Sequence, residues 1–198
     1  MIKLPNIHTE RLLLRPIHRQ DAPDIFEYAK LSKVGPAAGW MPHKSIKETF
    51  AFIDYVLSKK RDNQPGIWVI VLEASMKVIG TIEIHSYVGY KGELGFVLHP
   101  HYWNQGYITE ASLAVMMYAF ETLKLSRLEY CHFLDNVASQ RVREKLGFKE
   151  EGIKRLGFKH ENGKIMDEMV ASYTIEDYLS DKSKVFLPLR DKIRFYTP

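Results

Sequence analysis

The order in which the hydrophobic period changes along the chain constrains its fold more than any other feature. Apolar residues repeat at helical spacing within residues 21–57, at strand spacing within residues 67–98, and at helical spacing again within residues 107–124. A helical repeat predicts a helix with one buried face, and alternation predicts a strand. A chain that changes period in this way is predicted to be a mixed α/β domain.

Caps and breakers set the limits of the predicted elements. Pro16 ends the first strand, Asp21 is placed to cap the first helix, and Ser45 with Glu48 forms a capping-box pattern. Gly147 stops the last predicted helix. The predicted strands are 10–15, 67–72, 78–84, 93–98, 128–134, 148–156 and 166–175, and the predicted helices are 21–29, 45–57, 107–124 and 136–145.

Composition excludes several classes of protein. The chain has 198 residues, of which 45% are hydrophobic, enough for one well-packed domain, and no apolar run is long enough to span a bilayer. The single cysteine, Cys131, excludes an internal disulfide framework, so we expect a cytoplasmic protein. A net charge of +4 gives little support to nucleic-acid binding. The eight histidines form no HExxH motif or Cys/His cluster, so no metal site is expected.

The segment from Trp103 to Thr109 is the strongest candidate for chemistry. It follows a predicted strand, contains Gly106 and leads into the long apolar helix. Such a loop directs free backbone N–H groups and the positive end of a helix dipole at one point, as a phosphate site requires. Gly106 permits close approach of the backbone to a ligand, and Thr109 adds a hydroxyl donor. Glycine is common in such loops, so this feature alone does not define a function.

Four motifs occur in order around this loop. They are Thr9–Arg15 (TERLLLR), Glu93–Phe96 (ELGF), Tyr102–Ala111 (YWNQGYITEA) and Asn136–Phe148 (NVASQRVREKLGF). Together they resemble the GCN5-related N-acetyltransferase (GNAT) superfamily. Within it they are most similar to the bacterial branch that acetylates the N-terminal alanine or serine of ribosomal proteins. The resemblance covers residues 9–175 and implies an acetyl-CoA-dependent enzyme.

The resemblance implies an α/β (α+β) domain over residues 1–175, with about four helices and a mixed, mostly antiparallel seven-stranded sheet. The sheet is expected to splay between its fourth and fifth strands, residues 93–98 and 128–134, and to take acetyl-CoA into the gap. Residues 176–198 form a tail whose structure the sequence does not predict. Its apolar side chains either cover a surface of the domain or contribute to a homodimer; they are Phe186, Leu187, Phe195 and Tyr196.

The resemblance also implies which residues bind the cosubstrate. The end of the strand 93–98 is expected to pair through its backbone with the pantetheine arm, and the amides of the glycine loop to hold the diphosphate. Asn136 is expected to contact the pantetheine or the thiol, and Ser139 to face the same channel. The residues expected to bind acetyl-CoA are Val97, Leu98, Gln105, Gly106, Tyr107, Ile108, Thr109 and Asn136.

Two positions depart from the family's pattern. Ile108 stands where the family has glycine or alanine, and it is tolerable if its side chain points into the core. Arg143 stands seven residues after Asn136, where many relatives have a tyrosine that reprotonates the leaving thiolate. A guanidinium does not give up its proton at neutral pH. Either Ser139 relays a proton through water or the thiolate leaves unassisted.

Attack of an amine on a thioester needs proximity, a deprotonated amine and a donor to the developing oxyanion. The backbone N–H of Leu98 or His99 is a candidate donor. Glu83 and His85 share one face of a strand and Glu93 lies on the next, which makes them candidate bases. A solvated strand face explains Glu83 and His85 equally well. The candidate catalytic residues are Glu83, Glu93 and Ser139.

The acceptor stays open at this level, because the loops that contact it are the variable part of the family. A protein N-terminus, a polyamine, an amino acid or an aminoglycoside all fit. Trp40, in the loop 33–44, either lines the acceptor site or anchors packing. The second class of function is a CoA-binding sensor or interaction module that kept the fold without turnover, which Ile108 and Arg143 would favour.

Overall fold

The structure is a computed structural model that describes residues 3–58 and 64–196. The strands are β1 (Asn6–His8), β2 (Leu12–Pro16), β3 (Gly66–Leu72), β4 (Lys77–His85), β5 (Lys91–Leu98), β6 (Arg127–Phe133), β7 (Lys149–Lys159), β8 (Ile165–Thr174) and β9 (Arg194–Tyr196). The α-helices are α1 (Ala22–Ala29), α2 (Ile46–Leu57), α3 (Tyr107–Glu121), α4 (Val137–Leu146) and α5 (Ile175–Asp181). The strands form one sheet in the order β7-β8-β6-β5-β4-β3-β2-β1-β9.

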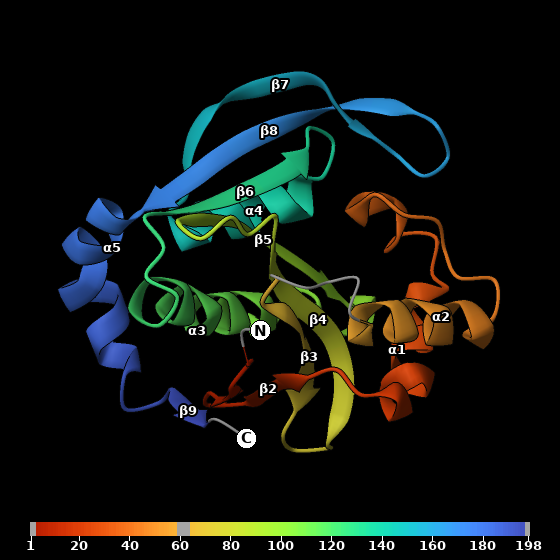
Figure 1. The fold of residues 1–198 in the computed structure, drawn as a ribbon, viewed down its shortest axis with the longest axis horizontal. Coiled ribbons are helices and arrows are strands. Elements are labelled where there is room, and N and C mark those ends of the chain that lie inside the picture. The colour runs from red at the N-terminus through yellow and green to blue at the C-terminus, as the bar shows by residue number, and fades with distance from the viewer. Residues whose placement is uncertain (1–2, 59–63, 197–198) are drawn as a thin grey trace.

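Every neighbouring pair in this sheet is antiparallel except β5 and β6, which are parallel. Helices α1 and α2 pack on one face and α3 and α4 on the other (Figure 1). Alternation along β3 supplies both cores, because Val69 and Val71 pack with α1 and α2 while Trp68 and Ile70 pack with α3. No helix in the described ranges is long and apolar enough to cross a bilayer.

The seven predicted strands and four predicted helices are all present, with ends that move by a few residues. The predicted total is wrong, because the described chain also contains β1, β9 and α5. Strands β1 and β9 have three residues each, too few to show a period. They are strands because they pair with each other across the whole length of the chain, with Ile7 opposite Phe195.

Two predicted caps are wrong. The Asp21 carboxylate makes no cap to α1; it accepts two hydrogen bonds from the Arg15 guanidinium, at 2.9 and 2.7 Å, and one from the His18 N–H. Ser45 precedes α2 as predicted but makes no side-chain cap, and the Glu48 carboxylate accepts from the Lys44 N–H instead. At Asp21 a charged guanidinium is a stronger donor than the helix N–H groups, whereas at Glu48 one backbone N–H takes the place of another.

The segment that follows β8 packs back onto the domain. After α5 it forms a π-helical turn, Lys182–Phe186, and a 3₁₀ turn before β9. Phe186 is 1% exposed, and its ring centroid lies 4.5 Å from that of Tyr178. The Glu121 carboxylate at the end of α3 accepts hydrogen bonds from Tyr178 Oη and from both terminal nitrogens of Arg190. This segment therefore belongs to the same core as α3.

Replacing Phe186 with alanine is expected to lower the free energy of unfolding by about 3–5 kcal/mol, because it empties a fully buried ring site. Urea unfolding followed by circular dichroism measures this. The matched control is Leu187→Ala, since Leu187 is 48% exposed and should change stability by less than about 1 kcal/mol. Equal effects of the two substitutions would contradict the packing of this segment.

Candidate active site

The site begins where β5 and β6 separate. These strands pair at three positions only, from Lys91 opposite Arg127 to Glu93 opposite Glu129. Past Glu93 they diverge, so the remaining edge of β5 has no neighbouring strand among the described residues. The splay predicted between residues 93–98 and 128–134 is therefore present.

Pairing with β4 decides which backbone groups of β5 face the gap. The His99 N–H donates to Ile79 O at 2.8 Å, and Val97 lies opposite Thr81. Backbone groups alternate between the two edges of a strand. The N–H and C=O groups of the alternate residues consequently point away from β4. The Leu94 N–H lies within the pairing with β6, and the groups of Phe96 and Leu98 lie past it and face the gap.

Because of this alternation, the backbone groups of Val97 and Leu98 point in opposite directions, although both were predicted to bind the pantetheine arm. The backbone of Val97 faces β4, and only its side chain reaches the cavity described below. The His99 N–H is already bonded, which leaves the Leu98 N–H as the candidate oxyanion donor. The Leu98 carbonyl accepts a 2.8 Å hydrogen bond from the Trp103 indole. Trp103 thus holds the end of β5 against the glycine loop.

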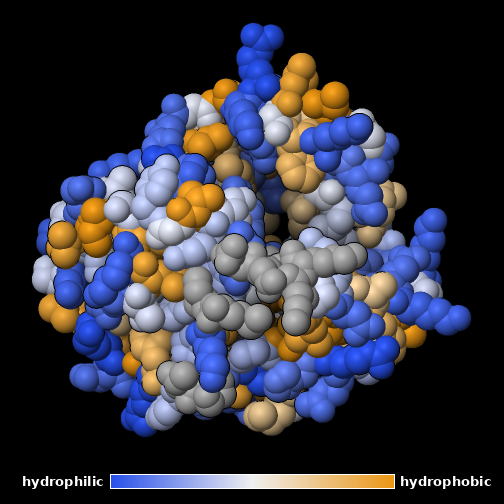
Figure 2. Space-filling model, in the orientation of Figure 1, coloured by the Kyte–Doolittle hydropathy of each residue, from blue (hydrophilic) through white to orange (hydrophobic). Residues whose placement is uncertain are grey.

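A cavity of about 1330 Å³ occupies the gap. It opens as a hollow below the arch of β7 and β8, between β6 with α4 and the loop that joins α1 to α2 (Figures 1 and 2). Ten of the eleven predicted site residues line it, the exception being Gln105. Those ten are Glu83, Glu93, Val97, Leu98, Gly106, Tyr107, Ile108, Thr109, Asn136 and Ser139.

The glycine loop has the geometry of an anion site. Gly106 precedes α3 with φ of 81°, a left-handed conformation that favours glycine. The first amide to bond within the helix is that of Glu110, which donates to Gly106 O. The N–H groups of Tyr107, Ile108 and Thr109 are therefore not used by the helix, and the positive end of a 15-residue helix lies behind them.

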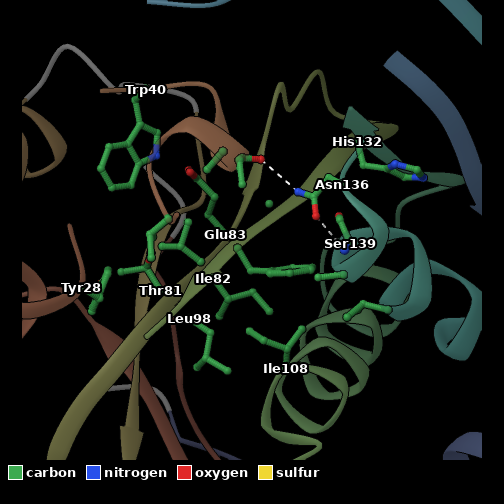
Figure 3. A pocket seen from close by; sticks show the side chains of 18 of the residues that line it. Tyr28, Trp40, Thr81, Ile82, Glu83, Leu98, Ile108, His132, Asn136 and Ser139 are labelled. Carbon is green, nitrogen blue, oxygen red and sulfur yellow. Dashed lines mark hydrogen bonds between the residues drawn. The ribbon is translucent and has the colours of Figure 1, made fainter. Parts of the chain in front are cut away.

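Ile108 and Gln105 have structural roles at this loop. Ile108 is 7% exposed and packs in the core under the cavity, so its size is accommodated there (Figure 3). Gln105 contributes bracing: its carbonyl accepts from Arg11 Nη1 at 3.0 Å, and its side-chain amide donates to His101 O at 2.9 Å. The predicted contact of the Gln105 amide with a diphosphate stays a prediction.

A second brace ties α3 to the turn between β1 and β2. The Glu110 carboxylate accepts from Thr9 Oγ1 at 2.6 Å, from the Arg11 N–H at 2.9 Å and from Arg11 Nε at 2.7 Å. The Arg11 guanidinium also lies 4.3 Å from the centroid of the Tyr107 ring. Thr9 and Arg11 belong to the TERLLLR motif, so this motif fixes the position of the glycine loop.

Most of the basic and most of the acidic side chains line different parts of the cavity. Arg141 and Lys145 extend from α4, and Lys33 Nζ lies 5.9 Å from the centroid of the Trp103 ring, beside the glycine loop. Acidic residues line the walls formed by β4, β5, β8 and the β7–β8 turn. They are Glu83, Glu93, Glu168 and Glu161, while Lys44 and Glu48 add one charge of each sign near the start of α2.

The candidate bases lie together on the face of the sheet that α1 and α2 cover. His85 lies opposite Glu93 in the register, with 3.9 Å between Nε2 and Oε1, and Glu83 lies opposite Gly95. A Cβ atom on Gly95 would lie 2.9 Å from the His85 ring and 3.7 Å from Glu83 Cγ, so glycine there makes room for both side chains. Glu83 extends into the cavity toward Trp40 (Figure 3).

Ser139 faces the other wall of the cavity and is paired with a residue that sequence reasoning missed. The Tyr130 hydroxyl lies 2.8 Å from Ser139 Oγ and also donates to Ser139 O at 3.0 Å. Burial raises the pKa of Tyr130, so its hydroxyl stays protonated. Tyr130 is buried on the same side of β6 as Leu128 and His132. A buried hydroxyl needs a hydrogen-bond partner, and that requirement is the signal that could have drawn attention to Tyr130.

Asn136 and Arg143 use their polar groups within the protein. Asn136 Oδ1 accepts the Ser139 N–H at 3.0 Å as the N-cap of α4, and its Nδ2 donates to Ala37 O at 3.1 Å (Figure 3). Asn136 therefore joins α4 to the loop that carries Trp40. The buried Arg143 side chain bonds to the Glu150 carboxylate on β7 and does not line the cavity.

Within the described part of the chain, no three His, Cys, Asp or Glu side chains are grouped so as to hold a metal ion. Cys131, on β6, is half-buried, and burial raises its thiol pKa. A thiol with a raised pKa is a poor nucleophile. The arrangement therefore offers amide donors, carboxylates, an imidazole and hydroxyls as its chemical groups.

Several known proteins are similar to this chain in sequence or in fold. The acetyltransferase (GNAT) domain family matches residues 11–149. The uncharacterised N-acetyltransferase YoaA of Bacillus subtilis (strain 168) is 32% identical over 85% of this chain and 96% of its own. A GNAT-family acetyltransferase from Bacillus anthracis has a TM-score of 0.76 at 29% identity, over 86% of this chain and 99% of that one. The ribosomal-protein-S5-alanine acetyltransferase from Vibrio fischeri shares the fold, with a TM-score of 0.68 at 23% identity over 85% and 96% of the two chains.

Gly106→Val is expected to lower the affinity for acetyl-CoA by at least about tenfold, which corresponds to about 1.4 kcal/mol. An added Cβ would lie 3.4 Å from Arg11 Nη2, which braces the loop, and valine rarely adopts this φ, so the amides would be displaced. Isothermal titration calorimetry measures the affinity. Gly89→Val is the matched control, because Gly89 has φ of 88°, no atom within 4 Å of its added Cβ, and no place in the cavity. Equal affinity of both variants would contradict the assignment of the loop.

Proposed function

The chain belongs to the GNAT acetyltransferase family and is an acyltransferase, and we propose that it transfers an acetyl group from acetyl-CoA to a primary amine. The amine attacks directly within a ternary complex. The observation that carries the proposal is the row of backbone groups on β5, which is left open by the splay and leads to the amide cradle at Gly106. An elongated ligand with amides in its middle and phosphates at one end matches this row.

The residues of the cavity are suited to acetyl-CoA in one orientation. The open edge of β5 can pair with the two amides of a pantetheine arm as an added strand would. The N–H groups of Tyr107, Ile108 and Thr109 then hold the diphosphate, and the cationic side chains of α4 lie on the same side. Acetyl-CoA supplies the thioester, whose carbonyl would lie near the Leu98 N–H.

The amine approaches from the face covered by α1 and α2. Glu83 or Glu93, with His85 beside them, removes a proton from the ammonium group so that the nitrogen lone pair is free. The nitrogen bonds to the thioester carbon, and the Leu98 N–H stabilises the oxyanion that forms. The nitrogen then gives its second proton to solvent, and the carbon–sulfur bond breaks. The products are an amide and a free thiol.

The thiol needs a proton when the carbon–sulfur bond breaks. Ser139 Oγ can donate it and take one in turn from the Tyr130 hydroxyl, to which it is hydrogen bonded. The tyrosine that many relatives carry on the helix is thus replaced by a tyrosine on β6, which acts through a serine. Arg143 takes no part, since its side chain points to Glu150.

The second candidate is a CoA-binding sensor without turnover, favoured by the position of Arg143 outside the cavity. Thermal-shift titration with CoA and acetyl-CoA, followed by a free-thiol assay over a panel of amines, separates the two. Stabilisation with thiol release supports the enzyme, and stabilisation without release from any amine supports the sensor. No stabilisation by either ligand contradicts both.

Glu83→Gln and Glu93→Gln test the base. Loss of the catalytic carboxylate is expected to lower kcat/KM by about 10²-fold or more. The effect should be largest at low pH, where the amine arrives protonated, and should fade at high pH, where the amine loses its proton unaided. Glu176→Gln, an exposed residue of α5 outside the cavity, controls for the change in charge. Wild-type pH–rate profiles in both variants would assign deprotonation to water or to the acceptor itself.

Ser139→Ala and Tyr130→Phe test the proton donor. Both are expected to lower kcat by about tenfold or more, while the affinity for acetyl-CoA stays near that of the wild type. Single-turnover kinetics separates the chemical step from product release. Ser180→Ala, on the exposed surface of α5, is the control. An unchanged chemical rate in both variants would show that the thiolate leaves unassisted.

A further inference from the structure

Glu168 is a buried carboxylate that the proposed reaction does not use. It lies on β8, is 9% exposed and lines the cavity. No hydrogen bond from the described residues reaches its carboxylate, and its cationic neighbour, Lys154 Nζ, is 3.9 Å away on a side chain that is 62% exposed. A buried carboxylate without donors is costly unless a ligand supplies them.

Burial is the main reason that Glu168 needs a partner, and the neighbouring charges act in both directions. Burial raises its carboxyl pKa, Lys154 lowers it, the negative charge of Glu93 raises it further, and His85 lowers it. Glu168 lies opposite Phe133 on β6, so it belongs to the wall across the gap from β4 and β5. The cavity thus has carboxylates on both sides of the gap at its acceptor end.

Aromatic side chains complete this end of the cavity. The rings of Phe133 and Phe158 meet edge to face with centroids 5.1 Å apart, and the Trp40 and His43 centroids lie 5.2 Å apart on the facing loop. The Glu161 carboxylate, in the β7–β8 turn, accepts the N–H of Met41 and ties this loop to the turn. Aromatic faces next to carboxylates favour alkylammonium groups.

We propose that Glu168 binds a second positive charge of the acceptor, so that the substrate is an amine that carries another cationic group, as a diamine or polyamine does. The inference rests on the proposed function, because it assumes that this end of the cavity receives the acceptor. One ammonium group goes to Glu83 and Glu93 for reaction, and the other goes to Glu168 across the gap. The aliphatic linker lies against the aromatic rings.

The test compares acceptors that differ only in the second charge. The wild-type enzyme is expected to acetylate 1,4-diaminobutane with a kcat/KM at least about tenfold above that for n-butylamine, the effect of one charged contact. Glu168→Gln, which keeps the shape of the side chain, should reduce this preference to near the statistical gain from two amines. Glu168→Asp, which keeps the charge, should retain most of it, and Glu176→Gln should leave it unchanged.

A basic peptide also combines a reactive amine with a second positive charge, as a diamine does. The tripeptides Ala-Lys-Ala and Ala-Gln-Ala, assayed in parallel, show whether the second charge is read on a free polyamine or on a protein N-terminus. A Glu168-dependent preference in either pair supports the inference. It is overturned if the wild-type enzyme does not distinguish the members of either pair, or if the preference survives in Glu168→Gln.

A binding measurement separates failure of this inference from failure of the proposed function. Calorimetric titration of 1,4-diaminobutane and n-butylamine into the protein saturated with CoA needs no turnover. Glu168-dependent binding of the diamine without thiol release would contradict the proposed reaction and leave the cation site standing. Thiol release with equal binding of both amines would contradict the cation site and leave the proposed reaction standing.

Discussion

The gap between β5 and β6 exists because these two strands pair at only three positions. A parallel strand leaves its neighbour through a crossover, here α3, and β6 returns at an angle that ends the pairing. The remaining edge of β5 would be a liability on an exposed sheet, since unpaired backbone groups attract other strands. Inside this domain the same edge forms the wall of a cavity, where the N–H and C=O of Phe96 and the N–H of Leu98 have no neighbouring strand among the described residues.

The gap needs to be held at a fixed width, and contacts from distant parts of the chain do this. Glu110 joins the start of α3 to Thr9 and Arg11, while Asn136 joins the start of α4 to the loop carrying Trp40. Both helix starts that face the cavity are thereby tied to segments about a hundred residues away. Hydrogen bonds to a charged group, such as those of Glu110, position a site more firmly than loop packing alone.

The cavity is also electrically divided. Lys33 lies beside the glycine loop, Arg141 and Lys145 line the cavity from the middle and the last turn of α4, and carboxylates line the walls formed by β4, β5, β8 and the β7–β8 turn. Under the proposed function, this division would favour one orientation of both substrates. It also connects the reaction to the proposed acceptor, because a cation drawn to Glu168 would bring its amine toward the opposite wall.

Local spacing in the sequence was enough to predict the long strands and helices, the Gly106 loop at the start of α3, and the shared face of Glu83 and His85. These depend on residues within one or two turns of each other. Other features depend on contacts that spacing does not show: β9 pairs with β1 from the other end of the chain, Asp21 bonds Arg15 instead of a helix end, and the Tyr130 hydroxyl is hydrogen bonded to Ser139. Only the register between β5 and β4 shows that the His99 N–H is already bonded and cannot be the oxyanion donor. Only the arch of β8 over the gap shows that Glu168 is buried. Periodicity records which face of an element is buried, but not which group lies opposite it, and that pairing is decided by the tertiary structure.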